Sequence, residues 1–251
     1  MSTYPTAQEA SQTPARPMGK LLETPSPPFP PPSTLEGRAC TLTPLSTAHY
    51  PLLHKAVCLP PAPPGLWDYM LRGPFPEFAK FEDAMNDLLN NNQGSTQYFV
   101  ICTAADGDGG AERIPMGMVS LIDIKPAHRS LEIGNVIYAP ALQRTAAATE
   151  ANLLLMRHAF ALGYRRVVWK CNDLNEASKR AALRLGFEYE GVSKCHMVVR
   201  GRNRDTAWYA MVEDDWPVAE RALVEWLKEG NFDGDGRQKE KLEDVRRRVA
   251  Q

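Results

Sequence analysis

The stretch YAPALQRTAAATEANLLLM, residues 138–156, turns from an extended pattern into a helical one within a few residues. Only small side chains stand where the helix starts, from Ala146 to Ala148. Small residues at a strand-to-helix turn let a ligand approach the backbone, and a helix N-terminus offers unpaired N–H groups and partial positive charge. That combination suits a phosphate group. A well-packed, alanine-rich helix start is an equally simple interpretation of this stretch alone.

The composition is that of an ordinary globular protein. The 251 residues carry a net charge of −1, with 24% charged and 43% hydrophobic residues. This suits one domain of roughly 200 residues plus tails. No window approaches about 18 consecutive apolar residues, so no membrane span is expected, and the N-terminus lacks the apolar core of a signal peptide. Without an excess of positive charge, nucleic acid is not an expected partner.

The spacing of cysteines and histidines argues against a metal site. The five cysteines are scattered, and none forms a C-x-x-C pair. An odd number cannot all pair within one chain, which favours reduced thiols and a cytoplasmic location. The five histidines show no H-x-x-x-H or H-E-x-x-H spacing, so we expect no metal. A G-x-S-x-G sequence is also missing, which leaves a serine hydrolase unsupported.

The chain divides by composition into three parts. Residues 1–34 are rich in proline and end in TPSPPFPPPST. Such a segment buries too little apolar surface to offset its ordering entropy, so we expect a disordered tail; a polyproline ligand for an SH3-like partner is the alternative. Residues 35–228 have a globular pattern. Residues 229–251 are highly charged, and we expect a frayed surface tail there.

Hydrophobic periodicity over the globular part predicts a mixed α/β domain. The expected order is strand, two helices, three strands, helix, strand, helix and two strands, with the helices covering a central sheet. We expect the helix at 145–162 to end at Gly163. The next helix is expected to begin at a capping box that opens with Asp173 and to end at Gly186. The glycine-rich segment at 105–113 is interpreted as a hairpin loop.

Two motifs, taken together, carry a resemblance to a known family. The acetyl-CoA signature of the GCN5-related N-acetyltransferase (GNAT) superfamily reads Q/R-x-x-G-x-G/A and often follows a proline. It is matched, in order, by Pro140, Gln143, Ala146 and Ala148. The run NEASKRAALRLGFEYEG, residues 175–191, and ATEA at 148–151 are similar to the RimJ/RimL-type branch. The chain from about Arg38 to Trp216 therefore resembles a GNAT protein of this branch.

This resemblance implies a fold and an activity. The fold is the GNAT-type acyl-CoA N-acyltransferase fold, in which helices flank a central, mostly antiparallel sheet. The activity is transfer of an acetyl group from acetyl-CoA to an amine on a small molecule, a protein N-terminus or a lysine. Direct transfer in a ternary complex is expected, because no cysteine lies where the resemblance places a nucleophile. The enzyme is expected to be a monomer or a homodimer.

The resemblance also indicates which residues hold the donor. Backbone amides at the helix start suit the pyrophosphate, with Arg144 adding charge; a solvated surface arginine is the alternative. These residues are Gln143, Arg144, Thr145, Ala146, Ala147, Ala148 and Thr149. The backbone of Val136, Ile137 and Tyr138 is expected beside the pantetheine arm, which is compatible with side chains in the sheet core. Asn175 would bind the pantetheine amide, unless it caps its helix.

Two residues are candidates for proton transfer. Glu132, in SLEIGNV, is the candidate base, acting through a water, and a glutamate in an ordinary salt bridge is the alternative. Ser178 is the candidate donor to the departing thiolate, and a helix-start hydroxyl bonded to the local backbone is the alternative.

The chain departs from the family pattern at two positions. Ala146 replaces the first glycine of the signature, and Ala182 stands where many members have a catalytic tyrosine. These departures keep open a degenerate CoA-binding module that serves an interaction or regulatory role. A structural protein that recruits partners through its proline-rich tail is a further alternative.

The acceptor side is the least defined part of the site. We expect the aromatic loop GLWDYMLRGPFPEF, residues 65–78, to shape the acceptor pocket. Asp205, Trp208 and Tyr209 are candidates to line it. The charged sequence RGRNRD at 200–205 is interpreted as a solvated hairpin turn.

Overall fold

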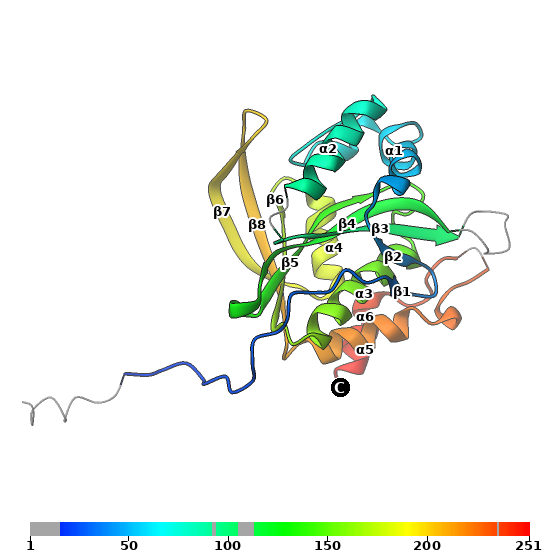
Figure 1. The fold of residues 1–251 in the computed structure, drawn as a ribbon. Helices are drawn as coiled ribbons and strands as arrows, with labels where there is room; N and C mark the ends of the chain where they lie inside the picture. Colours follow the sequence, from blue (N-terminus) through cyan, green and yellow to red (C-terminus); the bar gives the residue numbers. More distant parts are fainter. Residues whose placement is uncertain (1–15, 92–93, 105–112, 235) are drawn as a thin grey trace, which may run out of the picture.

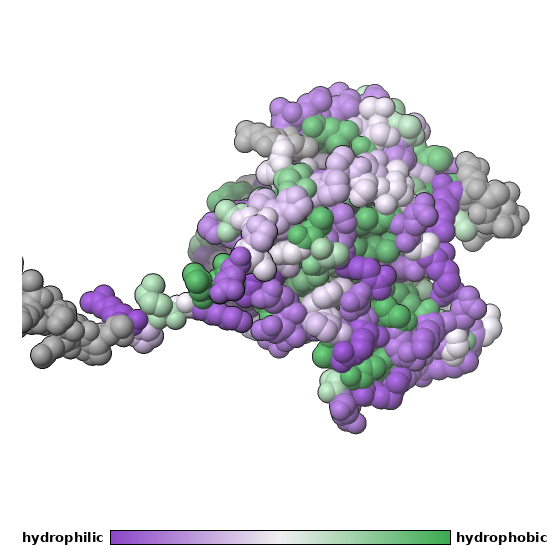
Figure 2. All heavy atoms as spheres, turned by 60° about the horizontal axis from the view of Figure 1, so that its bottom comes forward, coloured by the Kyte–Doolittle hydropathy of each residue, from purple (hydrophilic) through white to green (hydrophobic). Residues whose placement is uncertain are grey.

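The structure is a computed structural model that describes residues 16–91, 94–104, 113–234 and 236–251. The hairpin loop expected at 105–113 lies outside the described residues, except for Arg113, which opens a strand. In the described part of the chain, no helix has the length and apolar character needed to cross a membrane. The face drawn in Figure 2 mixes hydrophilic and hydrophobic residues.

A single sheet forms the centre of the molecule (Figure 1). Its eight described strands are β1 (Leu35–Glu36), β2 (Thr41–Pro44), β3 (Gln97–Ala104), β4 (Arg113–Lys125), β5 (Ser130–Tyr138), β6 (Arg166–Asn172), β7 (Glu188–Val199) and β8 (Arg202–Val212). They lie in the order β1-β2-β3-β4-β5-β6-β8-β7. Neighbours are antiparallel except β5 and β6, which are parallel. The predicted mixed α/β fold with a mostly antiparallel sheet is confirmed.

Helices cover both faces of this sheet (Figure 1). They are α1 (Tyr50–Cys58), α2 (Phe78–Asn90), α3 (Ala146–Ala161), α4 (Glu176–Leu185), α5 (Trp216–Trp226) and α6 (Leu242–Val249). Side chains of α1 and α2 pack with one face, in what we call the α1-side core. Side chains of α3 to α6 pack with the other face, in the α3-side core. The predicted element order holds, with β1, α5 and α6 in addition.

The parallel pair β5–β6 separates part of the way along its length. Pairing runs from Ser130 with Arg166 to Ile133 with Trp169, and no described pairing joins the rest of β5 to β6. On its other edge, β5 stays paired with β4 through a bulge at Asn135, whose φ is 51°. The Asn135 amide donates to Ser120 Oγ at 2.9 Å, which holds the bulge. The backbone of β5 after Ile133 therefore has no described hydrogen-bonded partner on the side of β6.

Local capping explains where the two central helices start. Thr145 is the N-cap of α3, and its Oγ1 accepts from the Ala148 N–H at 3.1 Å. Asn175 is the N-cap of α4, so the expected capping box at Asp173 is wrong. The chain is still in a turn at Asp173, so this residue cannot cap the helix. Its carboxylate instead forms an ion pair with Lys179 at 3.2 Å.

Part of the proline-rich segment packs on the domain, contrary to the expectation of a disordered tail. Pro27 and Pro30 are buried. The Tyr164 hydroxyl donates to the Pro28 carbonyl at 3.0 Å, and the Gln97 side chain donates to the Pro30 carbonyl. Proline has no N–H to satisfy, so an extended run of prolines can lie on an apolar surface while its carbonyls accept hydrogen bonds.

The C-terminal segment also packs, and the expectation that it frays is wrong for α6. Leu242 and Val245, three residues apart on one helix face, are buried in the α3-side core. The Arg246 guanidinium donates to the Arg184 carbonyl at 2.8 Å. The high charge of residues 229–251 favoured a frayed tail, and the two apolar positions were too few to predict a packed helix.

Candidate active site

The start of α3 presents unpaired backbone donors. The N–H groups of Thr145, Ala146 and Ala147 form no hydrogen bond with any described residue. The N–H of Ala148 is satisfied by the Thr145 side chain. Three free N–H groups and the positive end of the helix dipole together favour an anion at this point.

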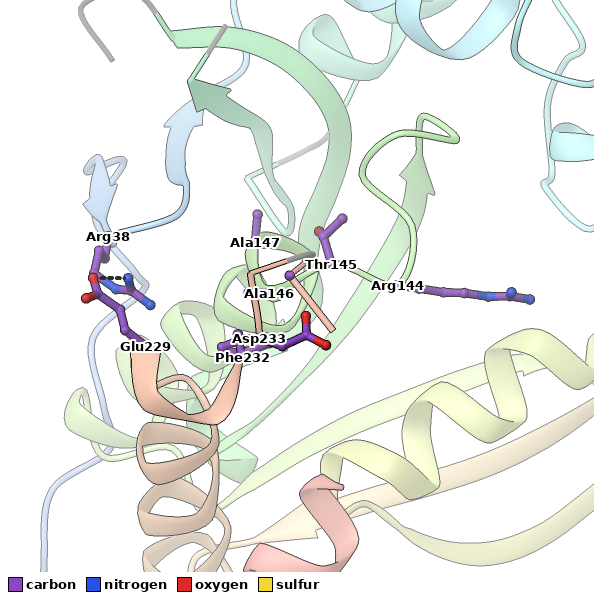
Figure 3. Close-up of a pocket in the computed structure, with 9 residues that line it drawn as sticks. Arg38, Arg144, Thr145, Ala146, Ala147, Glu229, Phe232 and Asp233 are labelled. Atoms are coloured by element: carbon purple, nitrogen blue, oxygen red, sulfur yellow. Dashed lines mark hydrogen bonds and ion pairs between the residues drawn. The ribbon is translucent and has the colours of Figure 1, made fainter. Parts of the chain in front are cut away.

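These donors open into a cavity of about 550 Å³ (Figure 3). Its lining residues are Arg38, Arg144, Thr145, Ala146, Ala147, Glu229, Phe232, Asp233 and Gly236. The segment after α5 thus builds one wall, and the Arg38–Glu229 ion pair, 2.6 Å long, closes one end. This contribution of the C-terminal segment was not foreseen from the sequence, where its charges suggested a solvated tail.

The backbone around the signature accounts for its missing glycine. The residue with a left-handed conformation is Arg144, whose φ is 63°, whereas Ala146 is the first residue of α3. A helical backbone conformation needs no glycine, so alanine fits at this position without strain. Gln143 donates its side-chain amide to the Tyr138 carbonyl at 3.0 Å and thereby fixes the turn. The Arg144 side chain extends away from the other lining residues (Figure 3).

The open end of β5 lies directly before this turn. Ile137 is buried in the α1-side core, while Val136 and Tyr138 pack against the α3-side core. On one edge Ile137 and Tyr138 pair with Met118 and Gly117 of β4. The backbone edge toward β6 has no strand partner among the described residues. In this segment the side chains pack in the two cores, while the backbone edge toward β6 has no described strand partner. The two interpretations of the segment are therefore compatible.

Glu132 lies at the point where β5 and β6 are still paired. It is buried, with 3% of its surface exposed, and its Oε2 is 2.8 Å from Lys170 Nζ. Burial raises the pKa of Glu132 to about 7, although the Lys170 charge acts to lower it. The salt bridge that was the alternative interpretation thus exists. It does not remove the capacity to exchange a proton near neutral pH.

Ser178 lies on the opposite side of the sheet from Glu132, in the first turn of α4. The Trp169 indole N–H donates to Ser178 Oγ at 3.0 Å, which orients the hydroxyl. Burial raises the pKa of the nearby Cys171 thiol, and the Ser178 side chain acts to lower it. The Ser178 hydroxyl thus lies near a buried thiol.

Asn175 has the capping role that was its alternative. Its Oδ1 accepts from the Ser178 N–H at 3.1 Å. The side-chain N–H₂ group makes no hydrogen bond with any described residue, so it is free to bind a ligand carbonyl.

The face of the sheet that carries Glu132 continues across β6 and β8. Lys170 Nζ lies over the Trp208 ring, 5.3 Å from its centroid, and the Trp208 indole donates to Ser193 Oγ at 2.9 Å. Trp208 thus lies on the same face as the candidate base, and its place in the acceptor pocket stays a prediction. Tyr209 does not lie on this face, because it points into the α3-side core. Asp205 accepts from the Cys195 N–H at 2.7 Å, on the face opposite Trp208.

The aromatic loop and the RGRNRD turn contact each other in the structure, and the role of the loop at the acceptor pocket stays a prediction. The rings of Trp67 and Phe75 in this loop pack edge to face, with centroids 5.1 Å apart, in the α1-side core. The turn is not simply solvated, because Arg200 donates to three carbonyls of the loop, those of Trp67, Asp68 and Gly73. This contact ties the β7–β8 hairpin to the loop beside the Glu132 face. A local sequence pattern holds no signal for such a distant partner.

Lys170, the ion-pair partner of Glu132, was missed in the sequence. Lys170 interrupts the buried strand RVVWKCN, and a charge inside such a strand is a signal that could have been followed. Among the residues that the structure describes, no group of three or more His, Cys, Asp or Glu side chains could hold a metal ion.

Splayed parallel strands and a helix start with free N–H groups are the two features that this fold brings together. Residues 40–188 match the acetyltransferase (GNAT) domain, and the chain belongs to the GNAT family. It is similar to a GCN5-related N-acetyltransferase from Brucella melitensis. The two are 34% identical, with a TM-score of 0.83 over 90% of this chain and 100% of that one.

Two further proteins extend the comparison. An uncharacterized N-acetyltransferase, YoaA of Bacillus subtilis (strain 168), is 33% identical over 99 residues, or 39% of this chain. The chain spans about half the length of that relative, 55%. RimL, a ribosomal L7/L12 alpha-N-protein acetyltransferase, shares the fold at 22% identity, with a TM-score of 0.59 over 72% of this chain and 94% of that one.

Proposed function

We propose that this protein transfers an acetyl group from acetyl-CoA to a primary amine, directly and within a ternary complex. The observation that carries the proposal is the cavity at the start of α3, into which Thr145, Ala146 and Ala147 present unpaired N–H groups. The residues present there fit a pyrophosphate, because the N–H groups are donors and the helix dipole is positive at this end.

The remaining donor contacts follow the open edge of β5. Backbone groups of Val136, Ile137 and Tyr138 would form hydrogen bonds with the pantetheine arm, which would take the place of a neighbouring strand along this edge. The free Asn175 amide would bind one of its carbonyls. The donor supplies an activated thioester carbonyl, and the chain's own task is to position it and to move protons.

Glu132 is the proposed base and acts through a water. With a pKa near 7 it exchanges protons at neutral pH, and the ion pair with Lys170 favours the carboxylate form that accepts a proton. Ser178 is the proposed acid, because its hydroxyl is oriented by the Trp169 indole in the first turn of α4. This hydroxyl would donate to the sulfur of the departing thiolate.

The degenerate CoA-binding module is the second candidate function. Ala182, where many members have a tyrosine, is the observation that favours it. The other departure, at Ala146, no longer supports it, because helical backbone at that position needs no glycine.

The proposal is tested by measuring acetyl-CoA binding and acetyl transfer to a panel of amines. Ala146→Asp adds a carboxylate at the first position of α3, where it favours the helix but repels phosphate. We expect the variant to stay folded and calorimetry to show acetyl-CoA affinity reduced by at least about tenfold, equivalent to repulsion of 1.4 kcal/mol. Ala141→Asp, at an exposed residue outside the cavity, is the control.

Two results would contradict the proposal. Unchanged affinity in Ala146→Asp would mean that the small residues serve packing alone. Binding of acetyl-CoA without transfer to any amine would favour the degenerate module.

A further inference from the structure

Arg204 on β8 is a buried charge that forms no hydrogen bond or salt bridge with any residue that the structure describes. Only 8% of its surface is exposed. Its guanidinium makes no hydrogen bond with any described residue, and its Nε is shielded from solvent. A buried cation that leaves its donors unused costs free energy, so such groups are normally paired. The buried Nε of this arginine has no partner in the described part of the chain and is available to a bound group.

The strand geometry places Arg204 on the face that carries Glu132. Residues two apart on a strand share a face, so Arg204 lies with Thr206 and Trp208. The pairing of β8 with β6 is regular through Trp208 and Thr206, and the bulge at this level falls in β7, at Cys195 with φ of 51°. The Arg204 charge is close enough to Glu132 to lower the pKa of that carboxyl, against the larger effect of burial.

The charged groups of this face leave an excess of positive charge. Glu132 forms its ion pair with Lys170 and also faces the Arg204 charge, so one carboxylate stands against two cations. Asp123, the other acid that acts on Glu132, forms its own ion pair with Lys125 at 2.8 Å. His196 lies at the edge of the face, hydrogen-bonded to Thr206 Oγ1 at 2.9 Å. A polyamine would meet net repulsion here, whereas an anionic group would be attracted.

We propose that the acceptor is an amine that also carries a carboxylate, and that Arg204 binds this carboxylate so that the amine lies beside Glu132. The inference rests on the proposed acetyl transfer and names its acceptor class. The planar guanidinium fork matches a carboxylate with two parallel hydrogen bonds, which fixes the orientation of the bound molecule as well as its position. Arg204 is then a specificity-determining residue.

The test compares amines that differ only in the carboxylate. A panel of amino acids, each with its amide and its decarboxylated amine, is acetylated by the full chain with acetyl-CoA, with spermidine as a polycation. We expect kcat/KM to be about 10–100-fold higher for the amino acids, the range that corresponds to one hydrogen bond to a charged group. Arg204→Gln should remove this preference while leaving acetyl-CoA affinity unchanged. Arg202→Gln, an exposed arginine on the same strand, should preserve it.

The outcomes separate this inference from the proposed function. The unaltered protein could acetylate amides, simple amines or spermidine as fast as amino acids. That result overturns the proposed acceptor class but leaves the proposed acetyl transfer standing. The protein could instead prefer succinyl-CoA to acetyl-CoA and lose this preference in Arg204→Gln. That result would assign Arg204 to the carboxylate of the acyl group and would also overturn the proposed acceptor class. This wild-type comparison decides the matter even if Arg204→Gln does not fold. Absence of transfer to every amine overturns the proposed function, and the acceptor class with it.

Discussion

At the scale of single residues, two opposing effects set the behaviour of Glu132. Burial disfavours its charge, and the Lys170 ammonium at 2.8 Å favours it. Burial prevails, so the carboxyl titrates close to pH 7, where a small change in environment decides how much base is present.

The activity should therefore follow the ionisation of Glu132. Because only the carboxylate accepts a proton, kcat/KM should rise as pH increases through about 7. Glu132→Gln should lower the rate near neutral pH by on the order of 10²–10⁴-fold and flatten this rise. Glu190→Gln, which breaks only the partly exposed pair with Arg166, is the control for the pH profile. An unchanged profile in Glu132→Gln would transfer the role of base to another group.

Ser178 should affect turnover without affecting donor binding. Ser178→Ala removes the hydroxyl that Trp169 orients, so kcat should fall well over about tenfold while the Kd for acetyl-CoA stays within about twofold. Ser178→Thr keeps a hydroxyl and should recover part of the rate. A kcat within twofold of the unaltered enzyme for Ser178→Ala would leave catalysis to positioning alone.

At the scale of elements, Glu150 of α3 joins the helix to the first hairpin. Its buried carboxylate accepts from the N–H groups of Arg38, Ala39 and Cys40, at 3.0, 2.6 and 3.0 Å. A Cβ at Gly37 would lie 2.6 Å from the same carboxyl group, so the turn needs glycine to approach it. The β1–β2 turn is thus held by a side chain more than a hundred residues away.

Removing this charge should destabilise the fold. Glu150→Gln replaces one acceptor oxygen by a donor that faces backbone N–H groups, so we expect about 2–3 kcal/mol less free energy of unfolding. Urea denaturation measures the difference. Glu220→Gln, which breaks the partly exposed ion pair with Arg157, should cost no more than about 1 kcal/mol. Equal costs for the two variants would contradict the assigned role of Glu150.

At the scale of the whole molecule, both terminal segments add to the domain. Pro27 and Pro30 lie buried against it, and the segment after α5 contributes Glu229 and Phe232 to the cavity at the start of α3. The family match over 40–188 includes neither segment. The packing of the domain and the lining of this cavity therefore include residues outside the matched range.

Two truncations measure the N-terminal contribution. A chain that begins after Ser33 should melt several degrees below one that begins after Glu23, because only the former loses Pro27, Pro30 and the bond from Tyr164 to Pro28. Each kcal/mol corresponds to about 2–4 °C in a domain of this size. Tyr164→Phe should reproduce part of the difference. Identical Tm values for the two truncations would mean that the segment adds no stability.

The sequence alone determined the features that depend only on residues close together along the chain. Periodicity, helix ends at Gly163 and Gly186, and the small-residue turn at Ala146 are local features, and they predicted the element order, the fold and the family. The roles of Ser178 and Glu132 remain predictions. Only the tertiary structure decided that Arg204 is buried, that Lys170 meets Glu132, and that charged or proline-rich terminal segments pack. The reason is physical: whether a charge is solvated or buried depends on surfaces supplied by distant parts of the chain, which no local pattern records.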